Sequence, residues 1–227
     1  MKSRSPTRRS MLLALAGLVP AAAFASPVLA CDSHLHQPMF TSAAAEVMDA
    51  AAVRDALRGL WIGHIFQVRN VVTATVGGNT AAAKASETAA VANAQAIAAA
   101  IEPFYGTKAK DQLFQLLAGH YGGIKSYLLA AVAKEKAAEG KAIDAITANA
   151  EEIAAFLSTA NPNLPKDDVL GLLQAHAGHH ITQIQQLLDK DYAGELLTWV
   201  DMTNHMYVIA DALAGAIAKQ FPEKIKA

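Results

Sequence analysis

Apolar residues recur at three- and four-residue steps along almost the whole chain from Asp49 onward. The first such stripe contains Leu57, Trp61, Val68 and Val72. This spacing places the apolar residues on one face of an α-helix, whereas a strand would alternate apolar and polar positions. We therefore expect an all-α protein, an up-and-down helical bundle of about six helices. The predicted helices span roughly residues 50–76, 80–101, 107–139, 141–159, 166–189 and 193–220.

Glycine, asparagine and proline residues set the limits of these helices. Gly77-Gly78-Asn79-Thr80 ends the first helix and caps the second. We expect Gly140 to end the third helix and the segment 161–165, which contains two prolines, to close the fourth. The connections are short, which favours antiparallel neighbours.

The helical pattern is an internal repeat. The segment 60–64, Leu-Trp-Ile-Gly-His, aligns without gaps with segments 116–120 and 172–176. The alanine-rich surroundings of Asn93 align in the same way with those of Asn149 and then with His205. Such self-similarity is typical of stacked supersecondary units. We predict three tandem 56-residue helical hairpins in a domain spanning residues 49–222.

Histidines interrupt the apolar stripes at equivalent positions. His64, His120 and His176 each stand inside the stripe of the first helix of a hairpin, and His180 follows one turn later. His205 shares a helix face with Ile209 and Leu213. We expect each hairpin to direct a polar residue inward from both of its helices.

Buried imidazoles need partners, since burying one without any costs roughly 1–3 kcal/mol. Four imidazoles converging in a bundle core would form a tetrahedral site for copper or zinc. The candidate metal ligands are His64, His120, His176, His205, His180 and Asp201. Axial ligation of haem by two histidines is the weaker alternative. A layer of hydrogen-bonded structural histidines is the competing interpretation.

No motif in the chain indicates catalysis. A nucleophile elbow, a phosphate loop, a dinucleotide fingerprint and a zinc-protease histidine pair are all missing from the sequence. The Glu-x-x-His pattern of di-iron bundles is missing as well, because Trp61 and Leu117 stand three residues before His64 and His120. Arg69 is expected to cap or pair locally. We predict a protein that is not an enzyme.

Composition and charge bear on the class of the protein, and the N-terminal residues predict its cellular compartment. The chain has 227 residues, 50 of them alanine, and a formal charge of −1, which gives no indication of nucleic-acid binding. Four basic residues and an apolar stretch make residues 1–30 a signal peptide, and Thr7-Arg8-Arg9-Ser10-Met11-Leu12 resembles the twin-arginine type. Removing it leaves 15 basic and 20 acidic side chains, a net charge of −5.

The residues after the signal peptide suggest a tether. Cys31, the single cysteine, follows Val28-Leu29-Ala30 and resembles the acylated cysteine of a bacterial lipoprotein. Residues 31–48 read as a flexible linker that carries His34, His36 and Met39. We expect the protein in the periplasm or on the outer face of the cell envelope, with any membrane contact made only through a lipid on Cys31.

Several short motifs resemble a family of small exported bacterial helical proteins. They are Leu60-Trp61-x-x-His64 with Arg69-Asn70, Pro103-x-Tyr105-Gly106, the segment 149–163 ending in Asn-Pro-Asn, and Lys219-Gln220-Phe221-Pro222. The resemblance covers about residues 57–222 and implies no established activity. Some members are described as glycosyltransferases, yet no sugar-nucleotide motif occurs here. Members often carry acidic residues before the first histidine, where this chain has Ile62-Gly63.

Two functions remain open at the level of sequence. In the first, the protein is an exported, lipid-anchored or free, helical bundle that binds copper or zinc through inward histidines. In the second, it is a non-catalytic envelope protein whose core histidines are structural and whose surface binds a protein or a small-molecule partner. The convergence of His64, His120, His176 and His205 within ligand reach is the feature that separates them.

Overall fold

The computed structural model describes residues 47–226, which form an all-α bundle of six helices, as the periodicity predicts. The predicted signal peptide, residues 1–30, and Cys31 lie outside the described residues. Among the helices of the described part, none is both long enough and apolar enough to span a membrane. The helices are α1 (Ala50–Val76), α2 (Thr80–Ala100), α3 (Glu102–Ala133), α4 (Lys136–Ala160), α5 (Lys166–Asp189) and α6 (Tyr192–Gln220).

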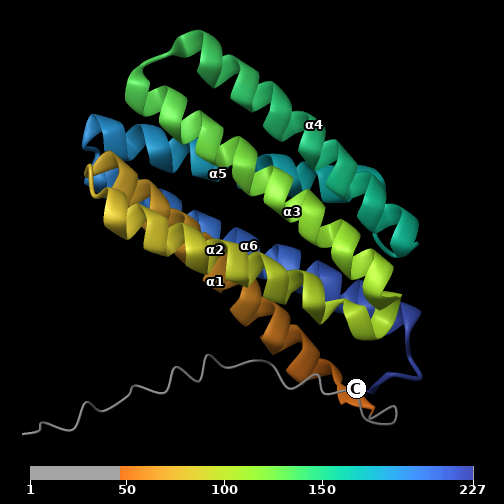
Figure 1. The fold of residues 1–227 in the computed structure, drawn as a ribbon. Helices are drawn as coiled ribbons and strands as arrows, with labels where there is room; N and C mark the ends of the chain where they lie inside the picture. The colour runs from red at the N-terminus through yellow and green to blue at the C-terminus, as the bar shows by residue number, and fades with distance from the viewer. Residues whose placement is uncertain (1–46, 227) are drawn as a thin grey trace, which may run out of the picture. The chain divides into compact units, whose positions relative to one another are not determined.

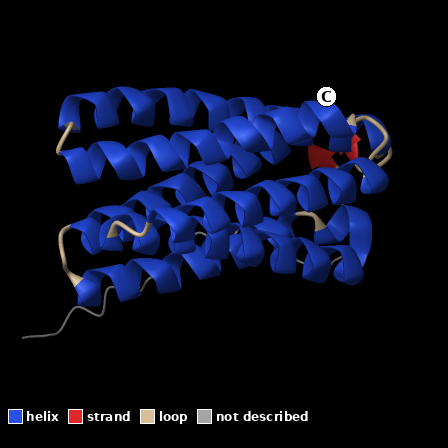
Figure 2. Ribbon diagram, turned by 90° about the horizontal axis from the view of Figure 1, so that it is seen from above, coloured by secondary structure: helices blue, strands red, loops and turns tan. Residues whose placement is uncertain are grey.

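The six helices form a closed ring. Each helix packs against the next one along the chain, and α6 packs back against α1. Helix α5 also contacts α3 and α1 across the centre. Figure 1 shows α1 and α2 side by side, followed by the green pair α3 and α4, with α5 and α6 behind them. Figure 2 shows the same helices joined by short loops. Residues that face the centre from α1, α3 and α5 can therefore meet.

The turn inside each hairpin has the same backbone conformation. Gly78, Lys134 and Lys190 stand 56 residues apart, at equivalent positions of the three predicted repeats, and all take positive φ, of 72°, 59° and 61°. In each turn the following backbone N–H bonds the carbonyl five residues earlier, from Asn79, Glu135 and Asp191 to residues 74, 130 and 186. These bonds satisfy carbonyls that a helix end leaves free.

Two predicted helix limits are wrong. The turn between α3 and α4 lies at Lys134–Glu135, so Gly140 stands inside α4 and does not end α3. A lysine in the left-handed conformation ends the helix there, where glycine is the residue that the sequence pattern leads one to expect. Helix α3 begins at Glu102, five residues earlier than predicted, because it continues across a kink at Gly106, with φ of 79°.

The core consists of apolar clusters on both sides of a histidine layer. One cluster joins the first half of α1 to parts of α2, α3 and α6, and includes Trp61 and Leu117. Another joins the second halves of α1, α3 and α5, and includes Val68 and Ile124. The buried residues of α2 and α4 are mostly alanines, among them Ala94 and Ala150. Alanine side chains let these helices pack closely against the larger side chains of α1 and α3.

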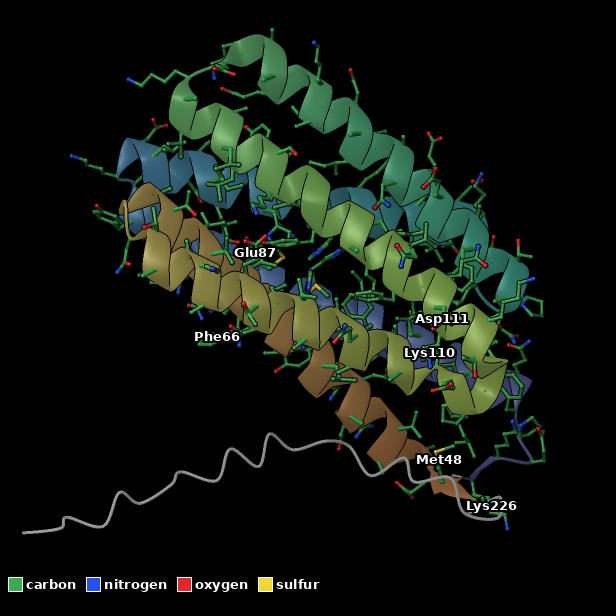
Figure 3. All side chains as sticks on the ribbon, viewed as in Figure 1. Met48, Phe66, Glu87, Lys110, Asp111 and Lys226 are labelled. Carbon is green, nitrogen blue, oxygen red and sulfur yellow. The ribbon has the colours of Figure 1, made fainter. Side chains whose placement is uncertain are left out.

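One end of the bundle is tied together by residues from distant parts of the sequence. Tyr105 donates its hydroxyl hydrogen to Gln220 at 2.9 Å and accepts a hydrogen bond from Asn161, which is 1% exposed. Two short strands, β1 (Met48–Asp49) just before α1 and β2 (Ile225–Lys226) after α6, pair in parallel. Figure 3 labels Met48 and Lys226 near each other there. Three of the short motifs noted in the sequence thus meet in one structural contact.

Candidate metal centre

Three histidines from two helices meet at the centre of the ring. His64 lies on α1, and His176 and His180 lie one turn apart on α5. Each is at most 6% exposed. One ligand nitrogen of each ring lies within 4.8 Å of the corresponding nitrogens of the other two. We call His64, His176 and His180 the triad. Among residues 47–226 it is the one group of three or more potential ligands with this spacing.

The rings of His64 and His176 both pack edge to face with the ring of His180, and they are tilted by 43° relative to each other. The centre of the His176 ring lies 4.6 Å from that of His180 and 5.7 Å from that of His64. The centres of the His64 and His180 rings are 6.1 Å apart, with planes at 87°. The three rings are thus in mutual contact, with one nitrogen of each within 4.8 Å of those of the other two.

Buried ring nitrogens of this group have no hydrogen-bond partner in the described part of the chain. They are both nitrogens of His176 and Nε2 of His180. Burial lowers the pKa of His64 to about 3 and holds the pKa values of His176 and His180 well below the ordinary value. Neighbouring imidazoles lower them further, because two positive charges would repel at these distances. The rings are therefore neutral near pH 7.

His120 lies beside the triad without belonging to it. Its ring packs on that of His176, with centres 5.6 Å apart and planes 24° apart. Burial lowers the pKa of His120 to about 4, an effect that the nearby Asn149 side chain partly opposes. Neither ring nitrogen of His120 has a hydrogen-bond partner among the described residues. A bound ion or water would provide one.

The structure does not bring His205 and Asp201 into this centre. Nε2 of His205 donates a hydrogen bond to the carbonyl oxygen of Leu172 at 2.8 Å, and the ring is half-buried. Asp201 is exposed on α6. The expectation of one site formed by His64, His120, His176 and His205 therefore needs correction. His205 is in register with Asn93 and Asn149, and it has their role, not that of the first-helix histidines.

Equivalent side chains tie each hairpin together at the level of the histidine layer. Nδ2 of Asn93 donates to the Leu60 carbonyl at 3.0 Å, and Nδ2 of Asn149 donates to the Leu116 carbonyl at 3.1 Å. The expectation that these residues point inward is corrected accordingly, since they bond the backbone of the preceding helix. The close approach requires small residues on that helix. A Cβ at Gly63 or Gly119 would lie 3.0 Å from the amide nitrogen.

A narrow apolar cavity begins at the histidine layer. Its volume is about 70 Å³, and His64, His120 and His176 are among its lining residues. Part of the lining recurs every 56 residues: α1, α3 and α5 each contribute residues from the two turns that precede the histidine, and α2, α4 and α6 each contribute an isoleucine at the equivalent position, among other residues. These turns begin at Leu57, Leu113 and Val169, and the isoleucines are Ile97, Ile153 and Ile209. Two members of the triad, His64 and His176, thus border an apolar cavity.

A partly buried ion pair, which the sequence does not indicate, lies beyond the other side of the triad. Arg69 on α1 forms two hydrogen bonds, of 2.6 and 2.7 Å, with the carboxylate of Glu195 on α6. Gln183, one turn after His180, donates to the same carboxylate at 3.1 Å. The prediction of a local partner for Arg69 is wrong, because its partner is 126 residues away. Nothing in the spacing of charges along the chain indicates such a pair.

Comparison of the chain with protein-family models, with curated proteins and with solved structures gives no significant match. The interpretation of the centre therefore depends on its geometry and chemistry.

Proposed function

We propose that this protein is an exported helical bundle that binds copper or zinc through His64, His176 and His180. The observation that carries the proposal is the mutual approach of three buried, neutral imidazoles whose nitrogens lie within 4.8 Å of one another. Neutral imidazole is the form that binds metal ions, so no proton has to be displaced near pH 7. Buried nitrogens without partners are costly unless they bind something.

The separations of the rings suit a shared ion. A metal about 2.1 Å from an imidazole nitrogen lies about 3.2 Å from the ring centre, so two rings on one trigonal or tetrahedral ion have centres about 5.2–5.5 Å apart. The observed separations of 5.7 and 6.1 Å lie above that range and the separation of 4.6 Å lies below it, so small shifts of the rings would bring all three onto one ion. His120, stacked on His176, is the side chain placed to supply a fourth nitrogen.

The charge around the triad favours copper in its monovalent state over zinc. No carboxylate belongs to the described cluster, and the adjoining cavity is apolar. The cost of burying an ion rises steeply with its charge, so a divalent ion without an anionic ligand is the less stable occupant. Imidazole suits both metals, and zinc therefore stays the competing choice.

The sequence supplies the cellular context of this proposal. A twin-arginine signal carries proteins that are already folded, which suits a protein loaded with metal before export. Lipid on Cys31 would hold the bundle at the envelope. From this context we infer a role in metal handling in the periplasm, in which the protein either carries the metal ion as cargo or keeps it as a resident ligand.

The metal content of the protein tests the proposal directly. The untagged chain, exported by its own signal, is purified and its metals are counted by elemental analysis, and metal-free protein is titrated with Cu⁺ under anaerobic conditions and with Zn²⁺. We expect one tightly bound ion per chain. A histidine tag would bind metal itself and must be left out.

Matched substitutions locate the site. His64→Leu and His180→Leu each remove one ligand and should abolish stoichiometric binding. Trp61→Phe is the control, because Trp61 is buried beside His64, with ring centres 6.0 Å apart, and supplies no ligand atom. Wild-type protein that binds neither ion would support the alternative, an envelope protein with structural histidines and a partner on its surface.

A further inference from the structure

The core holds a space that the proposed metal site leaves unused. The cavity beside the histidine layer has a volume of about 70 Å³, and all six helices contribute to its wall. It extends from His64 and His176 at the histidine layer to Asn161, the residue that caps the end of α4. A void of this size has a cost, because the atoms around it lose packing contacts. A ligand that fills the void would recover those contacts.

The cavity results from the regular arrangement of the helices. Most of its lining residues have counterparts 56 residues away that line it as well. One such set is Ile97, Ile153 and Ile209, which lie on α2, α4 and α6 and are all buried. The space therefore does not depend on one small residue at one position.

The wall of the cavity offers almost no polar group to a ligand. Its surface is almost entirely apolar, so the lining histidines present mainly ring carbon to it. At the far end, the Tyr105 hydroxyl donates to Gln220 and accepts from Asn161, so these polar groups bond one another. The cavity has room for water, since one molecule needs roughly 10–15 Å³, but a buried water also needs roughly 2–4 polar partners. We therefore expect the cavity to be dry.

We propose that the cavity is a binding site for one small, neutral, apolar molecule, in the size class of xenon and dioxygen, held beside the rings of His64 and His176. Such a molecule displaces no hydrogen-bonded water and gains dispersion contacts with the aliphatic wall. A charged or polar molecule would lose its hydration without receiving hydrogen bonds in return. Benzene is too large, since an engineered cavity that holds it has a volume of about 150 Å³.

This site is independent of metal binding by the triad. A molecule in the cavity nevertheless lies next to His64 and His176, two of the histidines that the proposed ion would share. The binding of an apolar molecule and the binding of a metal can therefore be tested separately on the same protein.

Isoleucine methyl groups report on the occupancy of the cavity. The methyl groups are isotope-labelled, and spectra of the metal-free protein are recorded by NMR under increasing pressure of xenon. We expect shifts that saturate with pressure at Ile97, Ile153 and Ile209, which line the cavity. Ile124 and Ile184 are matched controls, because they are equally buried but belong to the apolar cluster on the other side of the histidine layer. Their resonances should not move.

Dioxygen is the second probe. Because it is paramagnetic, dioxygen bound in the cavity would accelerate the relaxation of the lining methyl groups severalfold more than that of the two controls. Equal effects at lining and control methyl groups, with either gas, would indicate unspecific partition into the core and would overturn the site.

Two substitutions at one wall position complete the test. The larger indole of Leu113→Trp takes up much of the space and should abolish the xenon shifts at Ile153, whereas Leu113→Met nearly conserves the side-chain volume and should keep them. Circular dichroism confirms that each variant is folded, and the methyl groups of the wild type decide alone if Leu113→Trp is not. Shifts that persist in folded Leu113→Trp would overturn the cavity site. A wild-type chain that binds xenon but no metal would leave this site in place and overturn only the proposed function.

Discussion

His205 bonds the backbone of its own hairpin: its Nε2 donates to the carbonyl oxygen of Leu172 at 2.8 Å. The donor and acceptor are 33 residues apart, as are Asn93 and Leu60 in the first hairpin and Asn149 and Leu116 in the second. One contact thus recurs in each of the three hairpins. This contact explains why His205, although it lies on an inward stripe, is not a member of the triad.

Two positions change together in the third hairpin. Gly63 faces Asn93 and Gly119 faces Asn149. In the third hairpin, where His205 takes the place of the asparagine, the position equivalent to these glycines is Ala175. The longer histidine reaches the carbonyl past a methyl group that would crowd an asparagine. We therefore expect His205→Asn to lower the free energy of unfolding by about 1 kcal/mol, the net value of one hydrogen bond. Adding Ala175→Gly to His205→Asn should restore part of it.

Urea unfolding of the wild type, the single variant and the double variant measures this coupling. Ala175→Gly alone serves as the reference, and we expect it to destabilise the protein because it places glycine in a helix. A double variant whose loss equals the sum of the two single losses would contradict the proposed exchange of residues.

Gly63 offers a related test with an internal control. A Cβ there would lie 3.0 Å from Nδ2 of Asn93, so Gly63→Ala must disturb the bond to Leu60. Gly59, one turn earlier on α1, has open space where a Cβ would stand, with nothing within 4 Å, and Gly59→Ala should stabilise the helix by up to about 1 kcal/mol. We expect Gly63→Ala to be less stable than Gly59→Ala by roughly 1–2 kcal/mol in urea unfolding. Equal stabilities would contradict the close contact.

The fold could be predicted from the sequence because its signals are local. Apolar residues at helical spacing and the Gly77-Gly78-Asn79 break predict α1 and its end correctly. The limit between α3 and α4 escapes prediction because Lys134 takes a left-handed conformation that glycine usually adopts. Lys134 nevertheless lies 56 residues after Gly78 in the sequence. Adding the repeat length to the position of the first turn therefore gives the correct position of the turn between α3 and α4.

The candidate site could be predicted only in part. Helical spacing places His64, His176 and His180 on inward faces, and the structure brings them together. Spacing along one helix does not determine rotamers, so it could not show that the His120 ring stacks on that of His176 and lies outside the triad. Contacts between distant helices, such as Arg69 with Glu195, depend on the packing of the ring and leave no local signal.

Breaking the ion pair between Arg69 and Glu195 on one side only should destabilise the protein strongly. The Glu195 side chain is 3% exposed, and Arg69, at 28%, is its cationic partner. Arg69→Met leaves a buried carboxylate with only Gln183 as a donor, and we expect a loss of about 3 kcal/mol in the free energy of unfolding. Adding Glu195→Gln should recover part of it, because the uncompensated charge is removed. Thermal and urea unfolding of the three proteins provide the comparison.

Acid should destabilise the metal-free protein through its buried histidines. The pKa is about 3 for His64 and about 4 for His120 in the folded state, against about 6.5 in an unfolded chain. The unfolded state therefore binds more protons as the pH falls below 6.5, and the stability present above that pH is lost progressively down to the folded pKa values. The slope reaches about 1.4 kcal/mol per pH unit for each ring.

Urea unfolding at pH 7.5, 6.5, 5.5 and 5.0 measures the slope before most carboxylates titrate. His120→Leu should reduce it, since one ring no longer takes up a proton on unfolding. A free energy of unfolding that is constant between pH 6.5 and 5.0 would mean that these histidines are protonated or paired in the folded protein.

Replacing His176 distinguishes a ligand from a structural histidine. A histidine kept for stability loses its hydrogen bonds when it is removed, and the protein becomes less stable. Both nitrogens of His176 are instead buried without partners in the described chain, so His176→Leu replaces a costly polar group by an apolar one of similar size. We expect metal-free His176→Leu to equal or exceed the wild type by up to about 1 kcal/mol in the free energy of unfolding. With one equivalent of Cu⁺ or Zn²⁺ the order should reverse, because the ion stabilises only the protein that binds it. Unfolding curves recorded with and without metal give both comparisons. A metal-free variant that is less stable than the wild type by about 2 kcal/mol would identify His176 as structural, because that is the cost of losing satisfied buried hydrogen bonds.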